Sequence, residues 1–154
     1  MSNPIEQRLA NLGISLPDAP APAANYVPCV VVGDLVFISG QISMNDGEFI
    51  RGRLGDDMDV AAGAVAARAC GLALIAQLRS ACGGDLSRLR RVVKLTGFVN
   101  STPDFTDQPK VINGASDLMV EVFDNAGRHA RAAVGVSALP FGVAVEVEGI
   151  FQIG

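Results

Sequence analysis

The chain of 154 residues contains no tryptophan, a single tyrosine and a single histidine, and aromatic residues make up 5% of it. So few aromatic rings leave little on which nucleotide bases could stack. The net charge of −4 and the isoelectric point near 4.8 also oppose binding to a phosphate backbone, which requires clustered lysine and arginine. We therefore expect no nucleic acid partner.

Cysteine and histidine are too few for the common metal sites. The three cysteines, Cys29, Cys70 and Cys82, show no C-x-x-C spacing and lie in apolar stretches, which is typical of buried free thiols. His129 is the single histidine, so no second imidazole can share a metal ion with it. We expect neither a disulfide framework nor a metal site.

Long apolar runs and a signal-peptide pattern are also missing. The first ten residues include Glu6, Gln7 and Arg8, where a signal peptide requires an apolar core. No apolar run reaches the roughly 18 residues of a membrane span. These features predict a cytoplasmic protein without a membrane partner.

Apolar residues are abundant, at 49% of the chain, whereas charged residues make up only 18%. This composition, with a mean hydropathy of +0.35, excludes a disordered chain, and the length suits one domain. With so few charges, a monomer would expose apolar patches of the kind that usually contact another chain. We therefore expect a homo-oligomer.

Turn residues and hydrophobic periodicity predict the order of the elements. The expected elements are a helix at 4–12, an extended proline- and alanine-rich connector at 16–24, a hairpin of strands at 29–32 and 35–38, a loop at 45–57, a helix at 59–81, a strand at 91–99, a helix capped by Thr106 or Asp107 that ends before Gly127, and strands at 130–138 and 143–151. The chain therefore mixes helices and strands in one α+β domain.

The last two expected strands alternate clearly and are joined by a four-residue turn, which predicts a hairpin. In that pairing Arg131 shares one face of the sheet with Glu146 and Glu148. One interpretation is an ion pair on a solvated face, which would contribute little to stability. The other is a partly dry cleft at a subunit contact, in which the arginine binds a carboxylate with two hydrogen bonds.

Several segments together resemble one known family. They are Tyr26 ahead of the first hairpin, V-F-I-S-G-Q-I at 36–42, V-V-K-L-T-G-F-V at 92–99, Asn113, A-R-A-A-V-G-V at 130–136, Leu139-Pro140 and V-E-V-E at 145–148. In this order and spacing they resemble the RidA family, also called YjgF-like or endoribonuclease L-PSP-like proteins. The resemblance covers residues 26–154 and leaves residues 1–25 as an N-terminal helix and connector.

The resemblance implies a chorismate-mutase-like fold, in which a mixed β-sheet is backed by two α-helices. It also implies that three subunits close into a barrel-like homotrimer with clefts between adjacent subunits. Members of the family are enamine and imine deaminases, which hydrolyse 2-aminoacrylate and related 2-imino acids to 2-oxo acids and ammonia. A small 2-imino or 2-oxo acid is therefore the expected ligand, and the chemistry requires no cofactor.

The resemblance also implies roles for individual residues. Arg131 would bind the substrate carboxylate, and Glu146 would place and deprotonate a water molecule. Because we expect Glu146 to lie beside Arg131, its carboxylate should remain ionised, which makes it a weak base. The remaining positions that would line the pocket are Tyr26, Ser39, Gly40 and Asn113.

The chain departs from the family pattern in ways that indicate a divergent branch. Ala133 stands where the family often has cysteine, about 25 residues precede Tyr26, and the loop at 45–59 is extended. One alternative is a noncatalytic regulatory trimer that binds small molecules in the same clefts. A ribonuclease, suggested by the older family name, is disfavoured by the acidic composition and the scarcity of aromatic residues.

Overall fold

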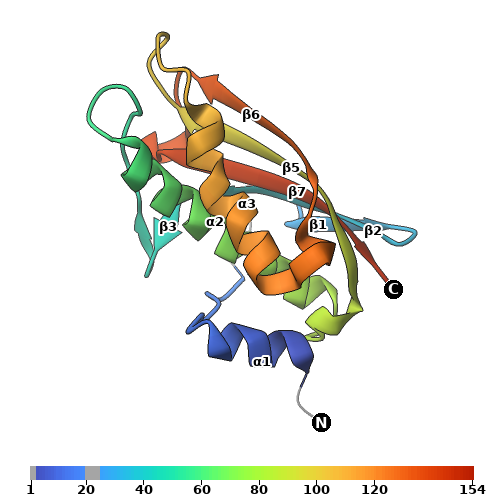
Figure 1. Cartoon of the computed structure of the whole chain (residues 1–154). Helices are drawn as coiled ribbons and strands as arrows, with labels where there is room; N and C mark the ends of the chain where they lie inside the picture. The colour runs from blue at the N-terminus through green and yellow to red at the C-terminus, as the bar shows by residue number, and fades with distance from the viewer. Residues whose placement is uncertain (1–2, 20–24) are drawn as a thin grey trace.

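One mixed sheet carries both long helices on a single face (Figure 1). The computed structural model describes residues 3–19 and 25–154, so residues 20–24 of the expected connector lie outside the described part of the chain. The elements are α1 (Pro4–Asn11), β1 (Cys29–Val32), β2 (Leu35–Ile42), β3 (Met44–Asn45), β4 (Glu48–Phe49), α2 (Val60–Ala81), η1 (Leu86–Arg88), β5 (Leu89–Asn100), α3 (Gln108–Phe123), η2 (Asp124–Gly127), β6 (Ala130–Val136), η3 (Pro140–Gly142) and β7 (Val145–Ile153). The expected α+β fold, a mixed sheet backed by two helices, is confirmed.

Helix α2 begins at a side-chain cap and ends at glycine. The Asp59 carboxylate accepts a hydrogen bond from the Ala62 amide at 2.8 Å, and Gly83 follows the helix with φ of +66°. Its 22 residues are long and apolar enough to cross a membrane, but half of the most apolar window is buried inside the fold. In this structure α2 is the central helix of the core.

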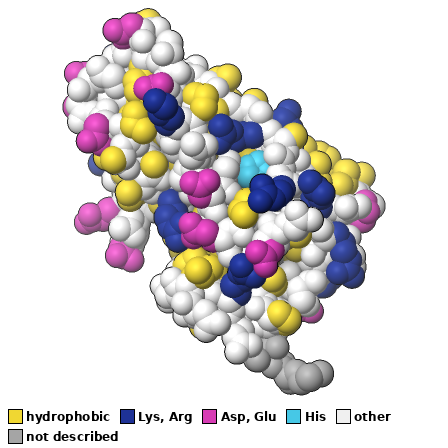
Figure 2. All heavy atoms as spheres, in the orientation of Figure 1, with side chains coloured by type: hydrophobic (Ala, Val, Ile, Leu, Met, Phe, Trp, Pro, Cys, Tyr) yellow, Lys and Arg dark blue, Asp and Glu magenta, His cyan; other side chains and the backbone are white. Residues whose placement is uncertain are grey.

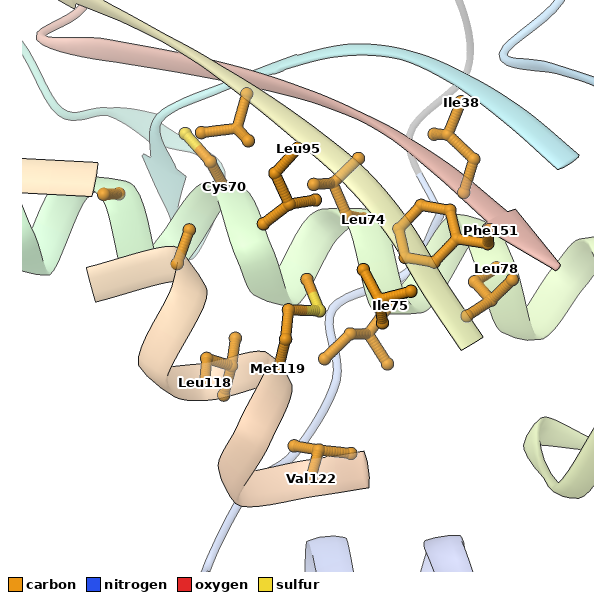
Figure 3. Packing of buried hydrophobic residues seen from close by; sticks show 14 of the residues in the cluster. Ile38, Cys70, Leu74, Ile75, Leu78, Leu95, Leu118, Met119, Val122 and Phe151 are labelled. Atoms are coloured by element: carbon orange, nitrogen blue, oxygen red, sulfur yellow. The ribbon is translucent and has the colours of Figure 1, made fainter. Parts of the chain in front are cut away.

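The core fills the space between the helices and the sheet (Figure 3). Leu74 and Ile75 of α2 and Met119 of α3 are fully buried there, as are Leu95 and Phe151 from the sheet. Each of these side chains stabilises the fold by about 2–3 kcal/mol through burial of its apolar surface. The core therefore holds α3 at a fixed position over the strands.

Two glycines allow α2 and α3 to approach closely. A Cβ atom added at Gly114 would overlap the backbone of Ala64, and one added at Gly63 would lie 3.2 Å from Val111. Because glycine has no Cβ, the helices can cross at a distance that a larger residue would prevent. This crossing places Asn113, the residue before Gly114, beside the sheet edge.

The strand order corrects one prediction, because the last two strands do not form a hairpin. The order is β1-β2-β7-β5-β6, so β5 lies between β6 and β7 (Figure 1). Strand β6 pairs with β5 in parallel, and β7 pairs antiparallel with both β5 and β2. Side-chain alternation indicates which residues share a face, but it does not identify the neighbouring strand.

The register also separates the three charged residues that the hairpin would have placed on one face. Arg131 pairs with Leu95, whose side chain is buried beneath the helices. Glu148 pairs with Thr96, and Glu146 pairs with Phe98. Thr96 and Phe98 are each an odd number of positions from Leu95 along β5, so their side chains point away from the Leu95 side of the sheet. Since side chains alternate along a strand, Arg131 lies on the helix side and both glutamates lie on the opposite, outer face.

Two smaller segments complete the comparison with the predicted elements. Helix α1 is confirmed: the Asn3 side chain caps it, Leu9 is buried, and the Arg8 Nε donates to the Glu121 carbonyl of α3 at 2.7 Å. The expected loop after residue 45 instead begins within a short hairpin, β3–β4. Asp46 and Gly47 have φ of 50° and 80° there, as a two-residue type I′ turn requires.

Candidate active site

Arg131 lies at the edge of the sheet, where β6 passes beside α3. Its Nη1 atom donates hydrogen bonds to Asn113 Oδ1 at 2.8 Å and to Ser116 Oγ at 3.2 Å. Asn113 and Ser116 are three residues apart on α3 and so share one face of that helix. Within the described part of the chain, Nη2 and Nε of Arg131 have no acceptor, so this side of the guanidinium can bind a carboxylate through two hydrogen bonds.

A histidine and a serine extend this cluster. Ser116 Oγ lies 2.9 Å from His129 Nε2, and His129 Nδ1 lies 2.6 Å from the Gly127 carbonyl oxygen. A carbonyl can only accept, so Nδ1 carries the proton and Nε2 of the neutral ring accepts from the Ser116 hydroxyl. Partial burial lowers the pKa of His129, and the positive charge of Arg131 lowers it further. The hydrogen bond to the Gly127 carbonyl raises this pKa, but by less than burial lowers it. The neutral form of the ring is therefore favoured.

Sequence reasoning did not identify Ser116 and His129, although their spacing contains a signal. His129 is two residues before Arg131, and Ser116 is three residues after Asn113. These intervals match the periods of a strand and a helix, so each residue points the same way as a predicted site residue. The one histidine of the chain reaches the surface among basic side chains on the face shown in Figure 2.

Glu146 belongs to a second cluster, on the outer face of the sheet. A Cβ atom at Gly40 would lie 2.5 Å from Glu146 Oε2, so glycine is needed there for the carboxylate to pack against β2. Ser39 and Gly40 together face Glu148, because the register shifts between Ile38 and Gln41. This β-bulge places Ser39 and Gly40 next to the two glutamates of β7, and bulges are frequent beside active sites.

The environment of Glu146 corrects the expectation that its carboxylate lies beside Arg131 and is therefore a weak base. Partial burial raises the pKa of the Glu146 carboxyl, and the Glu148 carboxylate raises it further. No hydrogen bond or ion pair connects Glu146 with Arg131 among the residues that the structure describes. The raised pKa makes Glu146 a better proton acceptor than the expected ion pair would have allowed.

Replacing Glu146 with glutamine is expected to raise the melting temperature at pH 7.5. The carboxyl has a pKa in the folded protein above its value in the unfolded chain. Its favourable contribution to the free energy of unfolding is therefore present at low pH and is lost as the pH rises through the folded pKa. Glutamine cannot ionise, so it avoids this loss. The difference between variant and wild type should therefore shrink at pH 4, as calorimetry can measure. Glu48→Gln, at an exposed site, is the control, and a less stable Glu146→Gln protein at pH 7.5 would contradict this account.

Two more predicted pocket residues lie near the bulge. The Ser39 hydroxyl donates to the Pro28 carbonyl at 3.2 Å, and the Ser39 amide donates to the same oxygen at 3.0 Å. These bonds attach the segment that precedes β1 to the middle of β2. Tyr26 lies two residues before Pro28 and is 49% exposed, so its ring is available to a partner outside the chain.

The outer face is not covered by the helices and exposes apolar side chains on the strands at both of its edges. Phe37 and Val134 are exposed to 41% and 45%, and Val30, which pairs with Phe37, is exposed to 50%. A hollow of about 180 Å³ on this face is lined in part by Phe37, Lys94 and Glu148. Exposed apolar patches of this kind are typical of contact surfaces.

The cysteines take no part in either cluster. Cys70 and Cys82 are buried free thiols, as predicted, whereas Cys29 is partly exposed. Burial raises the pKa of both buried thiols, which keeps them protonated and poorly reactive. Ala133, at the position where the family often has cysteine, pairs with Gly97 on the helix side and packs against the core.

The chain thus carries two clusters on opposite faces of one sheet. Arg131, Asn113, Ser116 and His129 form the arginine cluster, on the helix side. Glu146 forms the glutamate cluster on the outer face, with Glu148, Ser39 and Gly40 around it. The structure brings Asn113 to Arg131 and Gly40 to Glu146, but it does not bring the two clusters together.

Comparisons with known proteins match nearly the whole chain. The family described as "YjgF/chorismate mutase-like, putative endoribonuclease" matches residues 6–148. Protein TCP17 of Trypanosoma cruzi is 51% identical over 99% of this chain and 96% of its own length. A 2-iminobutanoate/2-iminopropanoate deaminase of Dermatophagoides farinae is 31% identical over 91% of this chain and 94% of its own. The crystal structure of Atu1372 from Agrobacterium tumefaciens has a TM-score of 0.91 at 48% identity, covering 97% of this chain and 92% of that one.

Proposed function

Because the chain belongs to the YjgF/chorismate mutase-like family, whose members are also called RidA proteins, we propose that it is a homotrimeric imine deaminase. Its substrates would be 2-aminoacrylate and related small 2-imino acids, hydrolysed to 2-oxo acids and ammonia. Relatives about 30% identical to this chain have the name 2-iminobutanoate/2-iminopropanoate deaminase. Protein TCP17, which is more similar, has a name that specifies no activity.

The observation that carries this proposal is the arrangement around Arg131. Asn113 and Ser116 hold one guanidinium nitrogen, and this leaves the opposite edge of the group for a ligand. A planar guanidinium bound in this way matches the two oxygens of a carboxylate. Every 2-imino and 2-oxo acid carries such a carboxylate next to the reacting carbon, so binding at Arg131 would also position the C=N bond.

The separation of the two clusters supports a site built between subunits. Arg131 and Glu146 lie on opposite faces of one chain, so one substrate molecule does not contact both from the same protomer. The outer face exposes Phe37, Val134 and Val30, which another subunit can cover. In the proposed trimer, the arginine cluster of one protomer meets the glutamate cluster of the next, and the complete ring holds three equivalent clefts.

The chemistry needs orientation and proton transfer more than a strong nucleophile, because an imine carbon is already electrophilic. Glu146 of the neighbouring protomer would take a proton from water as the water oxygen bonds to the imine carbon. The resulting carbinolamine then loses ammonia. Partial burial suits Glu146 to this step, since its raised pKa brings it closer to the working pH.

The purified protein is expected to accelerate hydrolysis of 2-iminopropanoate generated in the assay by an amino acid oxidase. The measurement follows loss of the imine before and after addition of the protein, with free ammonia and pyruvate as products. Heat-inactivated protein is the control. A protein that is stabilised thermally by 2-oxo acids but does not hydrolyse imines would replace this proposal with the noncatalytic binding trimer.

A further inference from the structure

A chain of three hydrogen bonds runs from the backbone of η2 to the guanidinium of Arg131. The Gly127 carbonyl accepts from His129 Nδ1 at 2.6 Å, and His129 Nε2 accepts from the Ser116 hydroxyl at 2.9 Å. The Ser116 oxygen in turn accepts from Arg131 Nη1 at 3.2 Å. Because a carbonyl only accepts, the direction of each bond sets the direction of the next, and the neutral imidazole leaves the serine lone pairs to the guanidinium.

The two hydrogen bonds of Arg131 Nη1 fix the orientation of the whole guanidinium. Nη1 carries two hydrogens, and Asn113 Oδ1 at 2.8 Å and Ser116 Oγ at 3.2 Å accept them. Since the guanidinium is planar and rigid, holding these N–H bonds also sets the direction of the edge formed by Nε and Nη2. That edge is the one that can bind a carboxylate, so Ser116 acts on a ligand only through the arginine.

The Ser116 hydroxyl requires an acceptor outside its own helix to hold the arginine in this way. A serine within an α-helix can donate back to the carbonyl four residues earlier, and its hydroxyl rotates between partners. Ser116 lies inside α3, and His129 Nε2 accepts its proton from the side of β6. This bond fixes the hydroxyl rotor, so that the oxygen lone pairs stay directed to Arg131 Nη1.

We propose that His129 is a positioning residue: acting through Ser116, it holds the Arg131 guanidinium in its carboxylate-binding orientation, and protonation of the imidazole releases this hold. The inference rests on the proposed binding of 2-imino and 2-oxo acids at Arg131 and adds pH sensitivity to it. In the protonated ring Nε2 becomes a donor, so the Ser116 oxygen would accept from two cationic groups. Repulsion between these groups weakens the bond to Nη1 and lets the guanidinium turn.

The groups around the imidazole keep it neutral at neutral pH. Partial burial and the positive charge of Arg131 on β6 lower the pKa of His129, and the Gly127 carbonyl of η2 opposes them with a smaller effect than burial. From α3 the ring faces the uncharged Ser116 hydroxyl. The charged side chains that flank these groups, including one on β5, are exposed to solvent, which screens their effect: Lys94, Asp117, Asp124 and Arg128. Protonation therefore occurs only on the acid side of the ordinary histidine range.

Direct binding of pyruvate, a 2-oxo acid, tests this role without requiring turnover. Calorimetric titrations from pH 8 to pH 5 use Glu146→Gln as the background of every variant, because its carboxyl is the cleft's other group with a shifted pKa. At pH 8, Ser116→Ala should bind pyruvate about threefold to tenfold more weakly than the background protein, the usual effect of one hydrogen bond. Ser116→Thr keeps the hydroxyl and should bind pyruvate as the background protein does.

A glutamine at position 129 separates the proton from the hydrogen bonds. In His129→Gln the side-chain oxygen can accept from Ser116 and the nitrogen can donate to the Gly127 carbonyl, but the amide cannot be protonated in this pH range. At pH 8 its affinity for pyruvate should equal that of the background protein. On acidification to pH 5 the affinity should fall about threefold to tenfold in the background protein and stay constant in His129→Gln. Ser80→Ala, at an exposed position on α2, is the control and should follow the background protein.

The possible outcomes separate this role from the proposed reaction. Equal pH profiles with and without His129, or an unchanged affinity in a folded Ser116→Ala protein, would overturn the positioning role. Tighter binding of pyruvate at low pH only when His129 is present would also overturn it, because the imidazolium would then act as a distant charge. The expected profiles in a protein that hydrolyses no imine would support the positioning role and reject the deaminase. A wild-type protein that neither binds pyruvate nor hydrolyses imines would reject both.

Discussion

Arg131→Ala is expected to lower kcat/KM for 2-iminopropanoate by about 100-fold to 10,000-fold while the proposed trimer persists. The variant loses two charge-assisted hydrogen bonds to the substrate carboxylate, each contributing about 1.5–3 kcal/mol, and every 1.36 kcal/mol changes the rate about tenfold. Arg131 is only partly buried and lies on an edge strand, so its loss should leave the fold intact. Steady-state kinetics and size-exclusion chromatography with light scattering measure both results.

Two further variants distinguish carboxylate binding from a general effect of charge. Arg131→Lys keeps a positive charge without the planar fork and should have intermediate activity. Arg128→Ala removes an exposed arginine three residues earlier in the chain and should retain activity. Wild-type kinetics in Arg131→Ala would show that the carboxylate binds elsewhere, and the site proposed here would be wrong.

Mixing two inactive variants is expected to restore about a quarter of the wild-type activity. In an equimolar mixture of Arg131→Ala and Glu146→Gln chains, a cleft is intact when one chain supplies Arg131 and its neighbour supplies Glu146. Random assembly of a cyclic trimer gives this combination in about one cleft in four. The activity of the refolded mixture measures it directly.

The control mixes Arg131→Ala chains with chains that carry both substitutions. No intact arginine is present in that mixture, so it should remain inactive although mixed trimers form. Two different affinity tags on the variants would show that subunits have exchanged. If mixed trimers form but the mixture of Arg131→Ala and Glu146→Gln chains has no activity, Arg131 and Glu146 act within one protomer. That result would contradict a cleft formed between subunits.

Local patterns were enough to predict most elements of this fold. The helices expected at 4–12 and 59–81 are present, capped by Asn3 and Asp59, and Gly33-Asp34 forms the turn of the expected hairpin between β1 and β2. These predictions were correct because caps, turns and helical periodicity act over a few residues. The final hairpin was wrong because adjacency in a sheet depends on contacts between distant segments, and β5 pairs with both β6 and β7.

The candidate site was predictable only in parts. The family resemblance named four residues that the structure brings together in two pairs. Arg131 donates a hydrogen bond to Asn113, and Gly40 packs against Glu146. Their placement on opposite faces depends on the strand between them, which no local pattern specifies. The contact of His129 with the Arg131 cluster depends on α3 packing beside β6, which also requires the tertiary fold.

By itself, the amino-acid sequence determined the kinds of secondary structure, the apolar residues of the core and the family, because each depends on residue types at short, regular intervals. The tertiary structure decided which strands are neighbours and which face of the sheet each charged side chain occupies. It also decided how far Glu146 and His129 are buried. This burial raises the pKa of the Glu146 carboxyl and lowers the pKa of the His129 imidazole. Burial and long-range packing set these properties, and both arise only when segments far apart in the chain come together.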